Sequence, residues 1–330
     1  MNKIYFDDRW IGDHGIGRFA DALQQRLDLQ ALRLKGSPSS PFDPVRMLAK
    51  TWRLPSRAVA FSPGYNAPLV VVRPYVFTMH DLNHLDVPAN SSVAKRLYYR
   101  IVLKRACRKA SRVLTVSEFS RDRIIDWSGV SPEKVTNVSN GVDSHYRPHG
   151  DKYDTDFTYL LSVGNRKPHK NERRLVEAFA RARINQEIRL LFTGEPTDEL
   201  QSAIRHLNLS SRVSFAGRVA EDRMPSLYRG ALGLLFPSLY EGFGLPVLEA
   251  MACGIPVLTS NVTSLPEIAG DAALLVDPLD VDAISRKIEQ LVDDVLLREK
   301  LRTKGLKRAN MFSWDYVASR VKEVLEEVAK

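Results

Sequence analysis

The second half of the chain alternates short apolar runs with longer segments of helical period, and this alternation limits the possible folds more than any other feature. Six runs rich in β-branched or aromatic residues predict strands at 157–164, 188–194, 212–217, 231–238, 254–260 and 272–278. Because these runs are largely apolar throughout, both faces of the strands should be buried. Strands of this kind that are separated by helices predict an α/β fold with a parallel sheet covered on both faces.

The first half of the chain repeats this pattern of strands and helices less clearly. With 330 residues, the chain exceeds the size at which a single hydrophobic core usually stops growing. Four further runs predict strands at 3–8, 57–64, 74–81 and 112–120. Residues 137–156 are rich in Asn, Gly, Pro and Asp, which is typical of a linker. We therefore expect two domains, 1–150 and 151–330, and an amphipathic helix at 313–330 that can pack back on the first domain.

Composition and cysteine usage argue against a secreted, a membrane-spanning, a disulfide-linked or a zinc-binding protein. With 44% hydrophobic and 26% charged residues, the chain is typical of an ordinary globular protein. The first ten residues lack the apolar run of a signal peptide, and no stretch approaches the roughly 20 apolar residues of a membrane span. We therefore expect a cytoplasmic protein. Cys107 and Cys253 lie far apart without companion ligands, which predicts core residues rather than a disulfide or a zinc site.

The positive charge is concentrated in the first half. Residues 1–150 contain 23 Lys plus Arg against 13 Asp plus Glu, a net charge of +10, whereas residues 151–330 contain 25 against 26, a net charge of −1. Segment 93–112 carries eight basic residues and no acid, interleaved with Leu97, Ile101, Val102 and Leu103. This pattern favours a basic amphipathic helix on an anionic membrane surface. A merely solvated basic face and a nucleic-acid site are the alternatives, and nothing else in the chain supports a nucleic-acid partner.

Two glutamates stand in the otherwise apolar stretch "EGFGLPVLEAMACGIPVLTS" (241–260). Burial of an unpaired carboxylate costs on the order of several kcal/mol, so Glu241 and Glu249 should have partners or a function. A helix that begins near Leu245 places Glu241 in the preceding loop and Glu249 about one turn into the helix. The first N–H groups of that helix form an anion site. Carboxylates beside it suit a hydroxyl-rich ligand such as a ribose or a sugar.

Two basic residues follow the end of a second predicted strand, 157–164. In "VGNRKPHKN" (163–171), Arg166 and Lys170 follow Gly164 and precede a predicted helix. Two fixed cations at this position can stabilise a diphosphate as it leaves. A solvated basic turn is the alternative for this segment taken alone. Its combination with the two glutamates favours a binding site, because ligands of parallel sheets bind at the carboxyl ends of the strands.

These motifs together resemble those of the retaining glycosyltransferases with the GT-B fold, which has two facing Rossmann-like domains and a cleft between them. The resemblance is to bacterial group 1 (family 4) enzymes of lipopolysaccharide and exopolysaccharide assembly, mannosyltransferases among them. In the second domain it is specific and is carried by "VGNRKPHKN", "EGFGLPVLE" and "GIPVLTSNVTSLPEIAGDAALLVDP". In the first domain it is patchier and is carried by "GIGRF", "MHD", "LTVSEFSR" and "NGVD".

The resemblance implies a role for each matching residue of the second domain. Glu249 would bind the ribose hydroxyls and Glu241 the donor sugar, while the main chain near Arg218 and Val219 would meet the base. Arg166 and Lys170, next to Gly164, would take the diphosphate. Sugar and phosphate would also be held by the backbone of Gly242, Phe243, Gly244 and Leu245.

In the first domain the resemblance implies a glycine loop at Gly15 and Gly17 that closes over the diphosphate, and a His80 that faces the reacting sugar. A structural role for His80 is the alternative. Retention in this family is usually ascribed to same-face attack assisted by the leaving phosphate, so no residue is assigned as nucleophile. No metal and no cofactor are expected besides the nucleotide-sugar donor.

Donor and acceptor are less closely specified by these motifs. The resemblance to O-antigen mannosyltransferases favours GDP-mannose, with a UDP-linked sugar as the other candidate. The acceptor is expected to be a glycan or a polyprenyl-diphosphate-linked oligosaccharide. Segment 93–112 would then hold the enzyme peripherally on the inner face of a bacterial plasma membrane.

Other functions fit the sequence less well. "GIGRFA" matches a loose dinucleotide fingerprint, but it begins well after its strand, and the region near "LQALRLKG" lacks the acidic residue that would hold an NAD ribose. The Asp-x-Asp pairs at 154–156 and 280–282 are better explained as turn or cap residues than as metal ligands. A sugar-nucleotide epimerase or hydrolase, and a catalytically silent binding subunit, share the fold and are the remaining alternatives.

Overall fold

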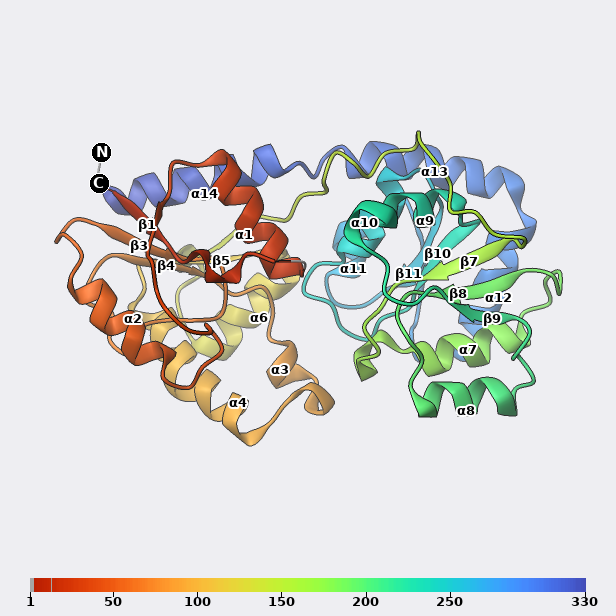
Figure 1. Ribbon diagram of the computed structural model, residues 1–330, viewed down its shortest axis with the longest axis horizontal. Helices are drawn as coiled ribbons and strands as arrows, with labels where there is room; N and C mark the ends of the chain where they lie inside the picture. The colour runs from red at the N-terminus through yellow and green to blue at the C-terminus, as the bar shows by residue number, and fades with distance from the viewer. Residues whose placement is uncertain (1–2, 13) are drawn as a thin grey trace. The chain divides into compact units, whose positions relative to one another are not determined.

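The structure is a computed structural model that describes residues 3–12 and 14–330. The chain forms two compact units (Figure 1), of which unit 1 comprises Met1–Gly141 with Phe312–Lys330 and unit 2 comprises Val142–Met311. The division after Gly141 lies within the predicted linker 137–156 and before the domain boundary expected at residue 150. The closing helix α14 (Trp314–Ala329) belongs to unit 1.

Unit 1 is built on a six-stranded parallel sheet with the order β2-β1-β3-β4-β5-β6. Its strands are β1 (Ile4–Phe6), β2 (Gln30–Ala31), β3 (Val59–Ser62), β4 (Tyr75–Thr78), β5 (Arg112–Thr115) and β6 (Val135–Asn137). The sequence did not predict β2 and β6, because each is too short and polar to form an apolar run. The predicted strand 112–120 was too long, since the hydroxyl of Ser117 caps helix α6 by accepting from the N–H of Ser120 at 3.1 Å.

Helices cover both faces of this sheet. One core joins the sheet to α2 (Asp43–Trp52), α5 (Lys104–Lys109) and α6 (Glu118–Ser128). The other joins it to α1 (Gly15–Arg26) and α14. The predicted helix 93–112 is present as α4 (Val93–Tyr98), a π-helical turn η3 (Tyr99–Leu103) and α5, and a short α3 (Asn83–Asp86) precedes it.

Unit 2 has a second six-stranded parallel sheet, with the order β12-β11-β10-β7-β8-β9. All six predicted strands of this half are confirmed, as β7 (Tyr159–Ser162), β8 (Arg189–Phe192), β9 (Val213–Phe215), β10 (Gly233–Phe236), β11 (Val257–Ser260) and β12 (Leu274–Val276). The helices are α7 (Glu172–Arg181), α8 (Asp198–His206), α9 (Met224–Gly230), α10 (Leu245–Ala252), α11 (Leu265–Ala269), α12 (Val281–Asp293) and α13 (Val295–Ala309). The predicted α/β class is therefore confirmed.

Strand order identifies where each sheet can bind a ligand. In unit 2 the chain runs outward from β7 to β9 and then returns to place β10 on the other side of β7. In unit 1 the corresponding reversal lies between β1 and β3. Ligands of open parallel sheets bind beyond the carboxyl ends of the strands at such switch points. We therefore expect ligands at the loops after β7 and β10 in unit 2, and at the loops after β1 and β3 in unit 1.

The two cysteines of the chain are core residues. Cys107 and Cys253 are free and buried, as predicted, and burial raises the pKa of each thiol to about 12. Over residues 3–12 and 14–330, no helix combines the length and the apolarity needed to cross a bilayer.

Candidate functional site

A lysine and a glutamate meet at the switch point of unit 2. Lys170 ends the turn that follows β7, and Glu241 lies in the loop that follows β10. The Nζ atom of Lys170 is 2.7 Å from Oε1 of Glu241, and their side chains are 14% and 13% exposed. Lys170 also lies over the ring of Phe236, 4.8 Å from its centroid. Two of the predicted site residues are thus brought together from opposite sides of the switch point.

The loop that carries Glu241 is fixed by hydroxyl groups and by one glycine. The Ser264 hydroxyl donates to the carbonyl oxygens of Glu241 and Phe243, at 2.9 and 2.8 Å. Gly244 has φ +115°, and a Cβ there would lie 2.8 Å from a Leu265 methyl, so the position requires glycine. Helix α10 begins at the next residue, and the N–H groups of a first helical turn lack intrahelical acceptors. The predicted anion site therefore adjoins Glu241.

Glu249 lies one turn into α10 and is only 3% exposed. Its Oε2 accepts a hydrogen bond from the Tyr228 hydroxyl at 2.7 Å. The Tyr228 ring packs edge-on against Tyr146, whose hydroxyl donates to Glu221 at 2.6 Å. The carboxylate therefore has a protein partner that offsets part of the cost of its burial. Tyr228 could not be identified from the sequence as a partner of Glu249, because the fold alone brings α9 against α10.

Arg166 is held by groups within unit 2. Its guanidinium is paired with Glu172, donates to the carbonyls of Thr193 and Glu195, and lies over the rings of Phe192 and Phe215, 5.0 and 5.5 Å from their centroids. Burial raises the pKa of Glu172, and the nearby guanidinium opposes that rise. In this arrangement Arg166 joins β8 to the start of α7. Contact between Arg166 and a diphosphate stays a prediction. It requires the guanidinium to leave some of its present partners for the phosphate oxygens.

Three further residues lie close to strand ends of unit 2. A Cβ on Gly164 would lie 2.6 Å from Oε1 of Glu172, so a larger residue there would displace that carboxylate from its place beside Arg166. Asn171 was not foreseen from the sequence; its buried side-chain amide donates to the carbonyls of Pro237 and Pro278, at 3.0 and 2.7 Å, and so ties the ends of β10 and β12 together. Val219 follows β9 in a half-buried loop, and its predicted contact with a base is untested.

In unit 1, His80 follows β4 and is 7% exposed. Its Nε2 is 2.8 Å from the carbonyl oxygen of Pro63, and its ring packs edge-on against Phe19 at 5.2 Å. Burial lowers the pKa of His80 to about 4, and the bond to Pro63 only partly offsets this effect. The imidazole is therefore neutral at pH 7, with its proton on Nε2 when that atom donates to the carbonyl.

The glycines predicted to form a loop are instead helical. Gly15 and Gly17 lie in the first turn of α1, and Nδ1 of His14 accepts from the N–H of Gly17 at 2.9 Å. A Cβ on Gly17 would lie 2.1 Å from the carbonyl oxygen of Gly12. The expectation of a glycine loop was thus wrong: Gly17 is needed because the preceding backbone crosses the helix closely. The role of both residues at a diphosphate stays a prediction.

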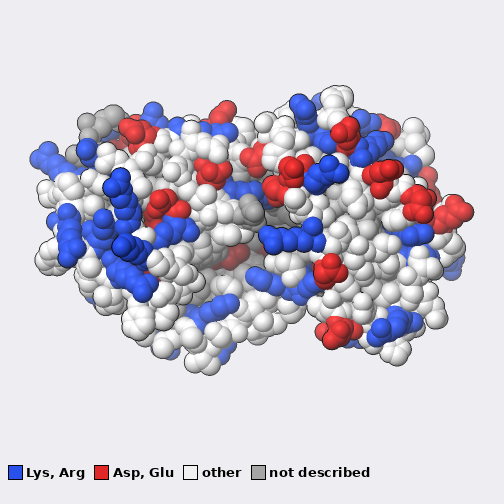
Figure 2. Space-filling model, viewed as in Figure 1, with Lys and Arg blue, Asp and Glu red and all other residues white. Residues whose placement is uncertain are grey.

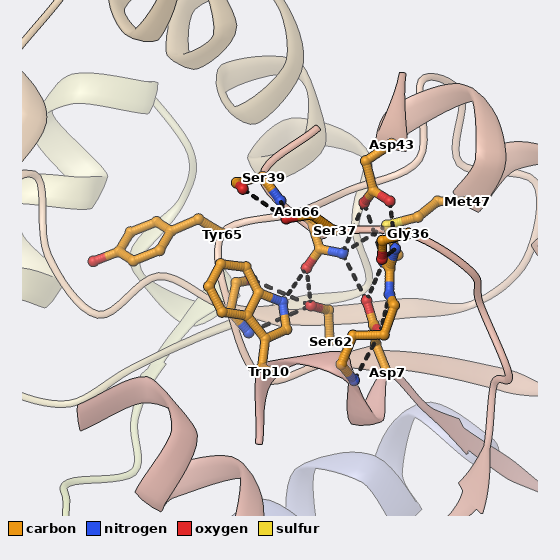
Figure 3. A network of polar contacts seen from close by, with 12 residues as sticks. Asp7, Trp10, Gly36, Ser37, Ser39, Asp43, Met47, Ser62, Tyr65 and Asn66 are labelled. Carbon is orange, nitrogen blue, oxygen red and sulfur yellow. Dashed lines mark hydrogen bonds and ion pairs between the residues drawn. The ribbon is translucent and has the colours of Figure 1, made fainter. Parts of the chain in front are cut away.

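The switch point of unit 1 holds a buried polar network (Figure 3). Arg9 pairs with Asp7 at 2.7 Å and with Asp43 at 2.6 Å, and both carboxylates are fully buried. The Asn66 amide donates to the same two carboxylates, at 2.7 and 3.0 Å, and its oxygen accepts from Trp10 Nε1 at 2.7 Å. The network ties the ends of β1 and β3 to the start of α2.

Within residues 3–12 and 14–330, no three His, Cys, Asp or Glu side chains lie close enough together to hold a metal ion. Asp280 is confirmed as a cap residue, since its carboxylate accepts from the N–H of Ala283 at 2.8 Å at the start of α12. Whether the reaction needs a metal is a separate question, and metal independence stays a prediction.

Comparison with known families covers both units. Residues 149–308 match the family described as Glycosyl transferases group 1, and residues 38–146 match Glycosyltransferase Family 4. Among solved structures, the chain resembles the Anabaena protein HepE in complex with UDP and glucose, with a TM-score of 0.78, 18% identity, and coverage of 99% of this chain and 100% of that one. At this level of identity the likeness shows a shared fold.

Curated relatives are more similar in sequence. The chain is 35% identical over 254 residues to O-antigen chain mannosyltransferase B of Escherichia coli, covering 73% of this chain and 67% of that protein. It is 31% identical over 234 residues to O-antigen chain mannosyltransferase RfbU of Salmonella typhimurium, covering 68% of this chain and 64% of that protein. The chain thus spans about two thirds of the length of these relatives.

Proposed function

The chain belongs to the group 1 glycosyltransferases and has the GT-B fold, and from this premise we propose that it transfers mannose from GDP-mannose, with retention and without a metal ion. The observation that carries the proposal is the Lys170–Glu241 pair just before α10, with Glu249 one turn into that helix, at the switch point of unit 2. The names of the two O-antigen relatives support mannose as the sugar.

The roles of these residues follow from their chemistry. Carboxylates accept hydrogen bonds from hydroxyl groups, so Glu249 would hold the ribose and Glu241 the mannose. Lys170 and the first N–H groups of α10 would bind the diphosphate and stabilise the charge that it gains as the bond from its oxygen to C1 of mannose breaks. The new bond joins C1 to the acceptor oxygen. The acceptor's proton passes to the departing diphosphate, so no protein nucleophile is required.

We further propose a glycan or a polyprenyl-diphosphate-linked oligosaccharide as acceptor, reached at an anionic membrane through segment 93–112. Val93, Leu97 and Ile101 are 73%, 54% and 53% exposed, and they follow one another at a spacing of four residues. Arg96 and Arg100 are exposed beside them. Leu103 was expected on this face, but it is buried in the core of unit 1.

Calorimetric titration with GDP, UDP, ADP and dTDP in EDTA tests the donor site. We expect one nucleotide, GDP, to bind, and Glu249→Ala to weaken its binding by about 1 to 3 kcal/mol, the scale for hydrogen bonds that involve a charged group. Glu249→Gln, which preserves the side-chain shape, controls for misfolding, and the exposed Asp293→Asn serves as the matched carboxylate control. Unchanged affinity in both Glu249 variants would place the ribose elsewhere.

Transfer itself needs a second assay. Purified protein is incubated with GDP-mannose and membrane extract or acceptor glycan in EDTA, and the anomeric configuration of the product is read by NMR. An α-linked mannoside establishes retention, because mannose in the donor is α-linked. Conversion or hydrolysis of GDP-mannose that is independent of any acceptor would instead indicate an epimerase or a hydrolase. Binding without turnover would indicate a silent subunit.

A further inference from the structure

Helix α2 presents an apolar row to solvent in addition to the face that it buries. It packs into the core of unit 1 through its buried residues Asp43, Pro44, Met47 and Thr51. On the other side Phe42, Val45 and Trp52 are 68%, 54% and 66% exposed, and the exposed Ala49 completes a spacing of three, four and three residues. Isolated exposed apolar residues are common, but an aligned row with two aromatic rings is typical of an interaction surface.

The charges around this row are almost all of one sign. Residues 33–57 contain one acid, Asp43, which is buried and paired with Arg9 at 2.6 Å. The same segment contains six cations, all at least partly exposed: Arg33, Lys35, Arg46, Lys50, Arg53 and Arg57. Figure 2 shows Lys and Arg side chains gathered over this region of unit 1. The partner of the row should therefore be anionic and able to accept apolar side chains.

The row lies close to the segment already proposed to meet a membrane. The N–H of Leu69 donates to the carbonyl of Pro44 at the start of α2, at 2.9 Å. The Tyr98 hydroxyl, at the end of α4, donates to the carbonyl of Tyr65 at 3.1 Å. Residues 65–70 thus connect the two helices within unit 1, and Leu69 is itself 39% exposed.

We propose that α2 is a second membrane-contact helix, whose Phe42, Val45 and Trp52 enter the headgroup boundary of an anionic bilayer while the flanking Arg and Lys side chains bind lipid phosphates. Trp is enriched at this depth, and basic amphipathic helices bind there through apolar burial together with attraction to anionic lipid. A symmetric dimer through α2 is disfavoured, since it would bring two basic surfaces together. The inference relies on the proposed function only for the presence of a membrane acceptor.

Vesicle binding by the full chain tests this inference. Sedimentation is compared for vesicles of phosphatidylcholine alone and for vesicles with 30% phosphatidylglycerol. We expect the triple variant Phe42→Ser, Val45→Ser, Trp52→Ser to lose about tenfold or more in partitioning to the anionic vesicles. The matched control replaces Leu279, Val295 and Leu296, exposed apolar residues of unit 2, by Ser and should bind normally. Thermal unfolding checks that both variants fold.

Two further measurements distinguish membrane insertion from surface adsorption, and binding through α2 from binding through segment 93–112. Brominated acyl chains should quench tryptophan fluorescence in the wild type and much less in Trp52→Phe, which keeps an aromatic anchor. Normal binding of the α2 variant, with binding lost when Val93, Leu97 and Ile101 become Ser, would overturn the role of α2 and leave segment 93–112 in place. Absence of wild-type binding to any vesicle, or a wild-type dimer that the α2 variant breaks, would also overturn it. Donor titration is independent of all these outcomes.

Discussion

The two units use the same place in a parallel sheet for different purposes. At the switch point of unit 2, Lys170 and Glu241 are paired but partly exposed, at 14% and 13%. At the switch point of unit 1, Asp7 and Asp43 are fully buried, and Arg9 and Asn66 satisfy their oxygens. In both units the switch point gathers polar groups because strand ends converge there, but in unit 2 they form a partly exposed pair and in unit 1 a buried scaffold.

Removal of the buried cation of unit 1 should have the largest effect on stability. Arg9→Met leaves two buried carboxylates with only Asn66 between them, and we expect it to lower the free energy of unfolding by about 3 to 5 kcal/mol. Chemical denaturation measures the change. Arg173→Met, in an exposed ion pair of unit 2, is the control and should cost less than about 1 kcal/mol. Equal losses would mean that the network of unit 1 is not a scaffold.

In unit 2 the largest effect should be on turnover. Lys170→Met is expected to reduce kcat at saturating donor by about 100-fold to 1000-fold, the scale for a lost electrostatic contact to a developing anion. Arg166→Met should instead reduce stability more than kcat, because its guanidinium is bound to Glu172 and to two carbonyls. A large loss of kcat in Arg166→Met at unchanged stability would show that Arg166 does reach the diphosphate.

The pH dependence of the free energy of unfolding tests whether His80 is buried in its neutral form. Its folded pKa, about 4, lies below the usual 6.5, so the unfolded state binds the proton first and stability falls as pH drops from about 6.5 to 4. The loss attributable to His80 is at most roughly 3 kcal/mol. His80→Gln, which can still donate to Pro63, should flatten this part of the profile, whereas His206→Gln, at an exposed site, is the control. An unaltered slope in His80→Gln would contradict the assignment.

The smallest expected effect is at Tyr228. Tyr228→Phe removes the hydroxyl that donates to Glu249 and should lower the free energy of unfolding by about 1 to 2 kcal/mol, because a buried carboxylate oxygen loses its partner. Nucleotide affinity is measured on the same protein. An affinity loss as large as that of Glu249→Ala would show that the hydroxyl orients the carboxylate for the ligand rather than only offsetting its burial.

Much of unit 2 could be predicted because its signals are local. Its strands are apolar runs between turn residues, and Glu249 lies one turn into α10 as the start of that helix at Leu245 requires. The direction of the Arg166 side chain could not be predicted, since it depends on the distance between β8 and the start of α7. Gly17 was misjudged for a related reason: the backbone that crosses it belongs to Gly12, and a motif does not show that contact.

The sequence alone specifies the alternation of strands and helices, the excess of positive charge in the first half, and the residue types available for binding. The three-dimensional fold pairs Lys170 with Glu241, 71 positions apart, because strand order brings their loops together. It also decided that Leu103 is buried while Phe42 and Trp52 face solvent. Periodicity shows that a helix has an apolar face, but the elements packed against that helix determine which face is covered.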